Sequence, residues 1–246
     1  MTFTLRSSPI IFPYLLYGHA LERCSQMRDL GVILDSRLTF AHHVDEVVAK
    51  ANRMLGLLIR SMQTVPCMRG DKFLYRPVLA AYYAHVRSII EYGSVLWSGA
   101  AVSHLARLER LQHRFLMWMA ARTQERCPPM DYCSLLKHFK CPSIKARFNY
   151  IDVNFMRSVF SGRLDCEHIV SLFSLSVPIR RSRHTGLFNV PPGRVNALQW
   201  YLLKRLPETI NSFMAACPED DFFAPSIHWK SQVLRFSEEQ GTYVQC

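Results

Sequence analysis

Several cysteine and histidine side chains that could hold a metal ion lie within one short stretch of the chain. They are Cys127, Cys133, His138 and Cys141, separated by five, four and two residues. Structural zinc sites place their ligands in close pairs such as Cys-x-x-Cys, which this spacing does not match. We therefore expect ordinary thiols here, and no metal ligand in this chain.

Other polar groups that could perform chemistry have simpler explanations. His42 and His43 with Asp45 could touch a metal, but their place at a predicted helix start indicates exposure to water. The acidic run Glu219-Asp220-Asp221 lies in a proline-flanked loop, which is typical of a solvated turn. The sequence contains neither a G-x-S-x-G nucleophile elbow nor a glycine-rich phosphate loop. We assign no catalytic residue.

The composition indicates a globular protein with a polyanionic partner. Hydrophobic residues make up 49% of the 246 residues and charged residues 20%, enough apolar content for a packed core. The formal net charge is +11 and Arg is commoner than Lys. Arginine binds phosphate through a planar fork of donors. Nucleic acid is the first candidate partner and an anionic membrane surface the second.

Basic side chains recur on one face of each of two predicted helices, over 42–62 and 101–122. They are Lys50, Arg53 and Arg60 on the first helix, and Arg107, Arg110 and Arg114 on the second. Such stripes suit the phosphate backbone of a nucleic acid. The alternative, which the sequence leaves open, is the ordinary solvated face of a core helix. Glu46 is also placed to pair with Lys50 one turn later.

The predicted fold is mainly α, a helical bundle preceded by a small N-terminal antiparallel β-meander. Apolar residues at three- and four-residue steps predict the helix over 42–62, with Thr39 as its N-cap. Arg87 and Glu91 are spaced to pair on a nearly all-apolar helix over 78–92. Further helices are predicted over 101–122, 131–139, 143–161, 166–173, 195–214 and 225–236. A basic loop at 179–184 is a further candidate for nucleic-acid contact.

The N-terminal region is predicted to form short strands. We predict strands over Leu30–Leu34 and Leu38–Phe40, joined by an Asp35-Ser36-Arg37 turn. Strands at 10–12 and 20–24 would extend this hairpin into a sheet of roughly three strands.

The sequence shows no signal peptide and no membrane span. No apolar h-region of a signal peptide follows Met1 to Thr4, and the apolar run 78–97 is interrupted by His85, Arg87 and Glu91. Eight cysteines without a regular pattern indicate free thiols. We expect an intracellular protein of the nucleus or cytoplasm, not a secreted one and not a membrane protein.

Several motifs in a fixed order resemble the reverse transcriptases of non-LTR (LINE-type) retrotransposons, most closely the jockey-like group. They are Asp29 through Phe40, Lys50 through Gly56, Val86 through Tyr92 with Val95-Leu96-Trp97, and Leu108 through Leu116, with weaker echoes at Cys141–Arg147 and Asn154–Gly162. The resemblance covers most of the chain, from about residue 1 to about residue 213. It implies the end of a palm with the primer-grip hairpin (1–40), a thumb-like bundle (41–127) and a C-terminal helical region (128–246).

The resemblance also implies roles for particular residues. Leu30, Gly31 and Val32 would hold the primer end, and the six basic residues named above would grip an RNA/DNA template-primer duplex. Reverse transcription needs paired carboxylates that hold two metal ions. In this family those carboxylates precede the primer grip, and no such motif precedes Asp29. We therefore expect no cofactor in this chain, with Mg²⁺ required only by the full enzyme, and no polymerase activity from this chain alone.

Two other functions remain open at this point. The chain could be a retroelement-derived helical interaction or scaffold protein with no nucleic-acid role, or a remnant without a function. Binding of a duplex, with an affinity that falls steeply as salt rises, distinguishes a template-primer binder from both.

Overall fold

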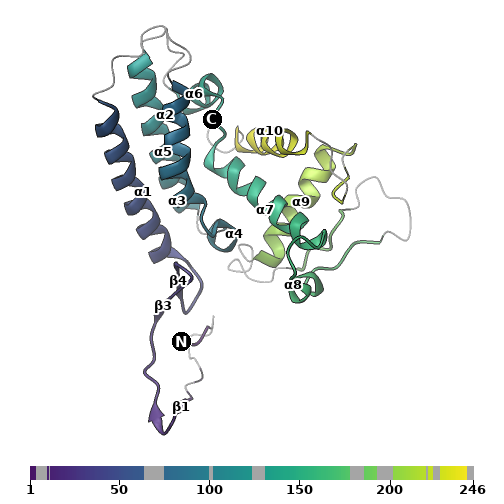
Figure 1. Cartoon of the computed structure of the whole chain (residues 1–246). Coiled ribbons are helices and arrows are strands. Elements are labelled where there is room, and N and C mark those ends of the chain that lie inside the picture. The colour runs from purple at the N-terminus through teal and green to yellow at the C-terminus, as the bar shows by residue number, and fades with distance from the viewer. Residues whose placement is uncertain are drawn as a thin grey trace.

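The computed structural model describes residues 1–3, 10, 12–63, 75–99, 102–123, 131–177, 186–192, 202–219, 221–223 and 228–242. These residues are mainly α-helical, with two small antiparallel strand pairs near the N-terminus. The predicted fold class is confirmed. Figure 1 shows a group of long helices, a hairpin at one end of that group, and a second group of helices beside it.

The first group is a bundle of three long helical segments. They are α1 (Ala41–Met62), the continuous run of α2 (Tyr75–Tyr82), the π-helical turn η1 (Tyr83–Arg87) and α3 (Ser88–Glu91), and α5 (Val102–Thr123). A single turn, α4 (Ser94–Trp97), precedes α5. The chain runs along the bundle, back, and along it again (Figure 1). The predicted helices lie within a few residues of these bounds.

Helices α1 and α5 therefore run parallel, and three contacts hold them in register. Arg107 pairs with Asp45, Arg114 donates to the Asn52 Oδ1 atom at 2.8 Å, and Arg122 donates to the Met62 carbonyl at 3.1 Å. The two members of each pair are 62, 62 and 60 residues apart. The side-by-side packing thus extends along most of both helices.

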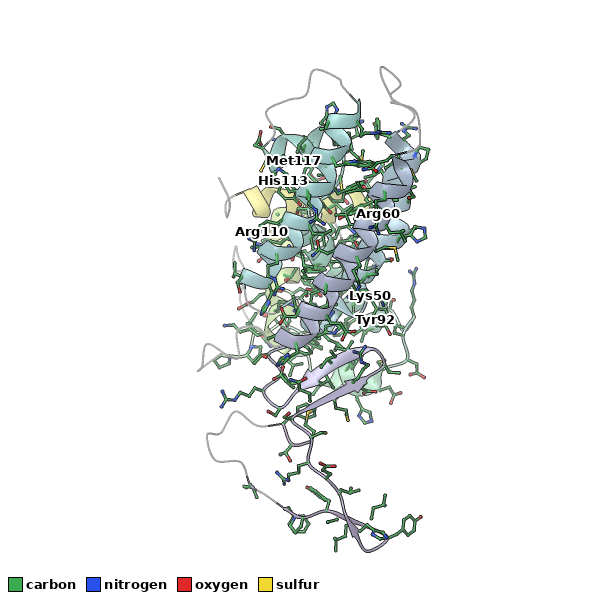
Figure 2. The ribbon with its side chains drawn as sticks, turned by 90° about the vertical axis from the view of Figure 1, so that its left-hand side faces the viewer. Lys50, Arg60, Tyr92, Arg110, His113 and Met117 are labelled. Carbon is green, nitrogen blue, oxygen red and sulfur yellow. The ribbon has the colours of Figure 1, made fainter. Side chains whose placement is uncertain are left out.

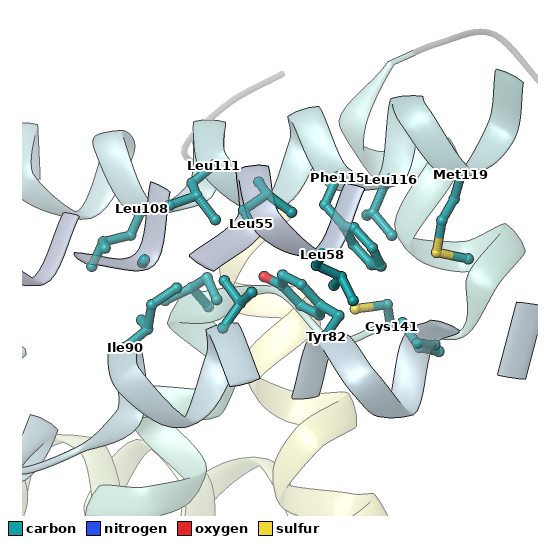
Figure 3. Packing of buried hydrophobic residues seen from close by; sticks show 14 of the residues in the cluster. Leu55, Leu58, Tyr82, Ile90, Leu108, Leu111, Phe115, Leu116, Met119 and Cys141 are labelled. Atoms are coloured by element: carbon teal, nitrogen blue, oxygen red, sulfur yellow. The ribbon is translucent and has the colours of Figure 1, made fainter. Parts of the chain in front are cut away.

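The apolar faces of the three segments form one hydrophobic core (Figure 3). The rings of Tyr82 and Phe115 stack with centroids 4.1 Å apart and planes 9° from parallel. Leu55 of α1 and Leu111 of α5 are both buried in the same cluster. Apolar area removed from water in this way is the main stabilising contribution to the bundle.

The hairpin before the bundle is formed by β3 (Gln26–Asp29) and β4 (Val32–Asp35), with its turn at Leu30-Gly31. The predicted strand over Leu30–Leu34 corresponds largely to β4, and the chain turns at residues 35–37 as predicted, with the Leu38 N–H donating to the Asp35 carbonyl at 3.0 Å. The predicted second strand over Leu38–Phe40 is wrong, and β4 pairs instead with β3. The reason is the Asp35 carboxylate, which accepts hydrogen bonds from the N–H groups of Arg37, Thr39 and Phe40. These bonds turn the chain directly into α1. Burial raises the pKa of Asp35, but the bonds from Thr39 and its neighbours outweigh it, and the pKa is lowered overall.

The first strand pair, β1 (Leu15–Leu16) and β2 (His19–Ala20), forms a separate short hairpin with Tyr17-Gly18 as its turn. The two pairs do not join into the three-stranded sheet that the sequence suggested. In Figure 1 this first hairpin projects away from the helices.

The second group of helices contains α7 (Ile144–Phe160), α8 (Glu167–Ser171), α9 (Leu202–Ala216) and α10 (Trp229–Thr242). Helix α6 (Tyr132–Phe139) packs in the bundle core through Leu135 and Phe139. Helix α7 belongs to two hydrophobic clusters. Ile144 and Phe148 pack in the bundle core, whereas Val153 and Met156 pack with α9 and α10. The division into 41–127 and 128–246 stays a prediction. Among the described residues, no helix has both the length and the apolar character needed to cross a membrane.

A largely buried ionic cluster joins the bundle to α7. The predicted pair of Arg87 and Glu91 is confirmed at 2.7 Å, and Arg147 of α7 binds both Glu91 carboxylate oxygens at 2.8 Å. Burial raises the pKa of Glu91, but hydrogen bonds from Arg147 and Arg87 lower it overall. Nearby, Arg205 of α9 pairs with the buried Asp152.

Candidate nucleic-acid interface

The solvent-facing sides of α1 and α5 form one basic face. Lys50, Arg53 and Arg60 are exposed on α1, and Arg110 and Arg114 are exposed on α5. Figure 2 looks onto both helices, with Lys50 and Arg60 on one and Arg110, His113 and Met117 on the other. Because α1 and α5 lie side by side, the fold brings the two predicted basic stripes together. We call these five exposed residues the basic face.

The acidic side chains near the basic face are already paired or buried. Asp45 pairs with Arg107, and Glu46 pairs with Arg28 of β3. The Glu109 carboxylate is buried within the fold, where it accepts the N–H groups of Ile144 and Lys145. The positive charge of the basic face is therefore largely uncompensated.

Of the six basic residues predicted from sequence, Arg107 differs from the others. Its guanidinium forms the ion pair with Asp45, which lowers the pKa of that carboxyl through the Arg107 hydrogen bond. Its charge is neutralised, and its contact holds α5 against α1. Arg114 donates one bond to Asn52 and remains exposed. Among the described residues, Arg53 and Arg60 have no ion-pair partner.

The β3–β4 hairpin is fixed at the start of α1. The Tyr92 hydroxyl donates to the Leu30 carbonyl at 2.7 Å. Gly93 has a φ of 61°, and a Cβ there would lie 3.2 Å from a methyl carbon of Val32. Glycine is therefore the residue that permits this close packing. Val32 is buried, so its contribution is to seat the hairpin, whereas Leu30 and Gly31 are exposed at the tip.

A buried histidine also supports the hairpin. The His43 Nδ1 atom accepts the N–H of Ile33 at 3.3 Å, and the imidazole packs edge-on against Trp97. Burial lowers the pKa of His43. The neutral imidazole is the form that can accept this bond, because the doubly protonated ring has donors on both nitrogens. His43 is therefore a support of the hairpin in this structure.

The other candidate residues that lie in the described part of the chain are not gathered into a site. The described residues contain no group of three or more His, Cys, Asp and Glu side chains that could hold a metal ion. Cys141 lies in the bundle core. Cys127, Asp220 and the basic loop at 179–184 lie outside the described residues.

Sequence reasoning missed Tyr92, His43 and Asp35 as the residues that position the hairpin. Tyr92 ends the motif Val86 through Tyr92, which resembles the reverse transcriptase family. That resemblance was the one sequence signal that could have drawn attention to Tyr92. Nothing in the sequence links Tyr92 to Leu30, because 62 residues separate them.

Comparison with known proteins gives one relation. Over 127 residues, 51% of this chain, the sequence is 32% identical to a Drosophila melanogaster protein named probable RNA-directed DNA polymerase from transposon BS. The matched region is 13% of that relative's length, so this chain corresponds to a small part of it. No family model and no solved structure matches the chain. The similarity supports a relation to retrotransposon reverse transcriptases.

Proposed function

We propose that this chain binds a template-primer duplex of RNA and DNA, as the primer-grip and thumb part of a LINE-type reverse transcriptase. The observation on which the proposal rests is the basic face, formed by Lys50, Arg53 and Arg60 of α1 with Arg110 and Arg114 of α5. In this proposal the role of the chain is binding of the duplex.

The geometry of the basic face suits a phosphate backbone. An α-helix rises about 1.5 Å per residue, so the Cα atoms of Arg53 and Arg60 are about 10 Å apart along α1. The parallel helix α5 adds a second row of cations beside the first. Arginine is the preferred residue for such contacts, because its fork of donors can bind two phosphate oxygens at once.

The hairpin provides a second part of the proposed interface. The β3–β4 hairpin lies at the end of the bundle where α1 begins (Figure 1), and its exposed tip is Leu30-Gly31. A duplex lying along the basic face would therefore have one end near this tip. The similarity to a transposon RNA-directed DNA polymerase supports the choice of a template-primer duplex among the polyanions.

Chemical protection of arginines tests the proposal. The chain is treated with an arginine-specific dicarbonyl reagent with and without an RNA/DNA hybrid duplex, and modified residues are identified by mass spectrometry. We expect the duplex to protect Arg53, Arg60, Arg110 and Arg114. Arg163, which is exposed after α7, is the internal control and should react equally in both samples. Equal reactivity of all these arginines would reject the proposal and favour the scaffold alternative.

A further inference from the structure

Two large side chains, one at the tip of the β3–β4 hairpin and one bonded to that tip, are exposed to water. Leu30 is 85% exposed and Tyr92 is 59% exposed. Leu30 also has a φ of 44°, a left-handed conformation that is uncommon for a residue with a branched side chain. Leu30 and Gly31, with a φ of 85°, together make the kind of turn that normally favours Asn or Asp followed by Gly. An exposed leucine at this position has no structural explanation in the hairpin itself.

The ring of Tyr92 is held in one position although it is exposed. Its hydroxyl donates to the Leu30 carbonyl, and a Cβ at Gly31 would lie 3.4 Å from the Tyr92 Cε1 atom. The carbonyl of Tyr92 is itself held, because it accepts the indole N–H of Trp97 at 3.0 Å. A ring that is fixed in advance loses little conformational entropy when a ligand covers it.

The Tyr92 ring lies at the hairpin end of the bundle, the end at which α1 begins. Arg28 of β3 pairs with Glu46, and Lys50 follows Glu46 by one helical turn. Figure 2 shows Tyr92 below Lys50 and Arg60, at the hairpin end of the bundle. Proteins that bind single-stranded nucleic acids combine cations, which hold the backbone, with aromatic rings, on which the bases stack. The hairpin end of the bundle offers such a ring, and the basic face of α1 and α5 offers the cations.

We propose that Tyr92, with Leu30 beside it, stacks an unpaired nucleobase next to the end of the duplex held on the basic face. This inference rests on the proposed function. The Tyr92 hydroxyl is already bonded to Leu30, so the ring offers its apolar surface rather than a hydrogen bond. Stacking of this kind accepts any base, because every base has a π-face.

The experiment uses RNA/DNA duplexes with a single-stranded overhang and the fluorescent base 2-aminopurine, whose emission falls when it stacks. In separate duplexes the probe occupies the terminal pair or one of the first three unpaired positions. Binding of Tyr92→Leu, Tyr92→Phe and the unchanged chain is measured by anisotropy and by quenching. Phe223→Leu removes a half-exposed aromatic ring beyond α9 and is the matched control.

We expect the unchanged chain, Tyr92→Phe and Phe223→Leu to quench one of the probes. Tyr92→Leu should not quench it, and should bind the overhang duplex about tenfold more weakly, as loss of one stacked base predicts. Its affinity for a blunt duplex should equal that of Tyr92→Phe, which loses the same hydroxyl bond to Leu30 but keeps the ring.

Two contrary results are distinguishable. If the unchanged chain binds no duplex, the proposed function fails. If the unchanged chain binds duplex but Tyr92→Leu quenches each probe as strongly as the unchanged chain does, the stacking role is wrong while duplex binding stands. The same conclusion follows if Tyr92→Leu lowers the affinity for blunt and for overhang duplexes equally. In the last case Tyr92 acts only by seating the hairpin.

Discussion

Arg53→Glu combined with Arg60→Glu is expected to weaken binding of an RNA/DNA duplex at least about a hundredfold at about 0.1 M salt. The change removes two phosphate contacts and places two carboxylates against the phosphate backbone. Like charges brought together at an interface cost several kcal/mol, and each 1.4 kcal/mol is about a tenfold change in affinity. Both side chains are exposed, so the variant should fold normally.

The matched control is Arg163→Glu combined with Lys230→Glu. Both residues are exposed and lie in the second helix group, and the change in net charge is identical. Because charges more than about 10 Å from the bound backbone are largely screened at this salt, we expect a loss of no more than about threefold. Anisotropy titrations of both variants measure the difference. Equal losses in the two variants would mean that net charge, and not the basic face, is responsible for binding.

Glu91→Ala is expected to destabilise the fold by about 3–5 kcal/mol. The substitution removes the carboxylate that binds both Arg87 and Arg147. The Arg87 side chain is only 7% exposed, and it would keep its charge without its carboxylate partner. An unpaired buried charge is among the most costly defects in a folded protein. The ion pairs also join α3 to α7, so the attachment of the second helix group should weaken.

Thermal unfolding followed by circular dichroism measures this effect, with Glu46→Ala as control. Glu46 also pairs with an arginine, but its side chain is 40% exposed and that of Arg28 is 56% exposed. Exposed pairs contribute about 0–1 kcal/mol. For a chain of this size we expect Tm to fall by about 10 °C for Glu91→Ala and by less than about 3 °C for Glu46→Ala. Similar shifts for both would contradict a stabilising role for the buried cluster.

The helices were predictable because their apolar periodicity is local. The helix predicted over 42–62 differs from α1 by one residue. The spacing of Val44, Val47, Val48 and Ala51 places them on one face of a helix, and this follows from the sequence without knowledge of what they contact. The pair of Arg87 and Glu91 was predictable for the same reason, as its members are four residues apart on one helix. The third member, Arg147, is 56 residues from Glu91, and no local pattern indicates it.

The hairpin and the arrangement of the site depended on contacts that sequence does not reveal. The turn at Leu30-Gly31 lacks the Asn-Gly or Asp-Gly signal that predicts such turns, so its register was misplaced. Asp35 indicated a turn, which the structure has, but its residue type did not show that its carboxylate accepts the N–H groups of Thr39 and Phe40 and so leads the chain into α1 and not into a second strand. The two basic stripes were predictable, but their common face follows from the parallel packing of α1 and α5.

The salt dependence of duplex binding tests the central claim most directly. If the five residues of the basic face each neutralise one phosphate, the logarithm of the association constant should fall with the logarithm of salt concentration with a slope of about −4 to −5. Affinity should then fall about 500-fold between about 50 mM and about 200 mM salt. A slope near zero, or no binding at the lower salt concentration, would contradict the claim that this chain grips a nucleic-acid backbone.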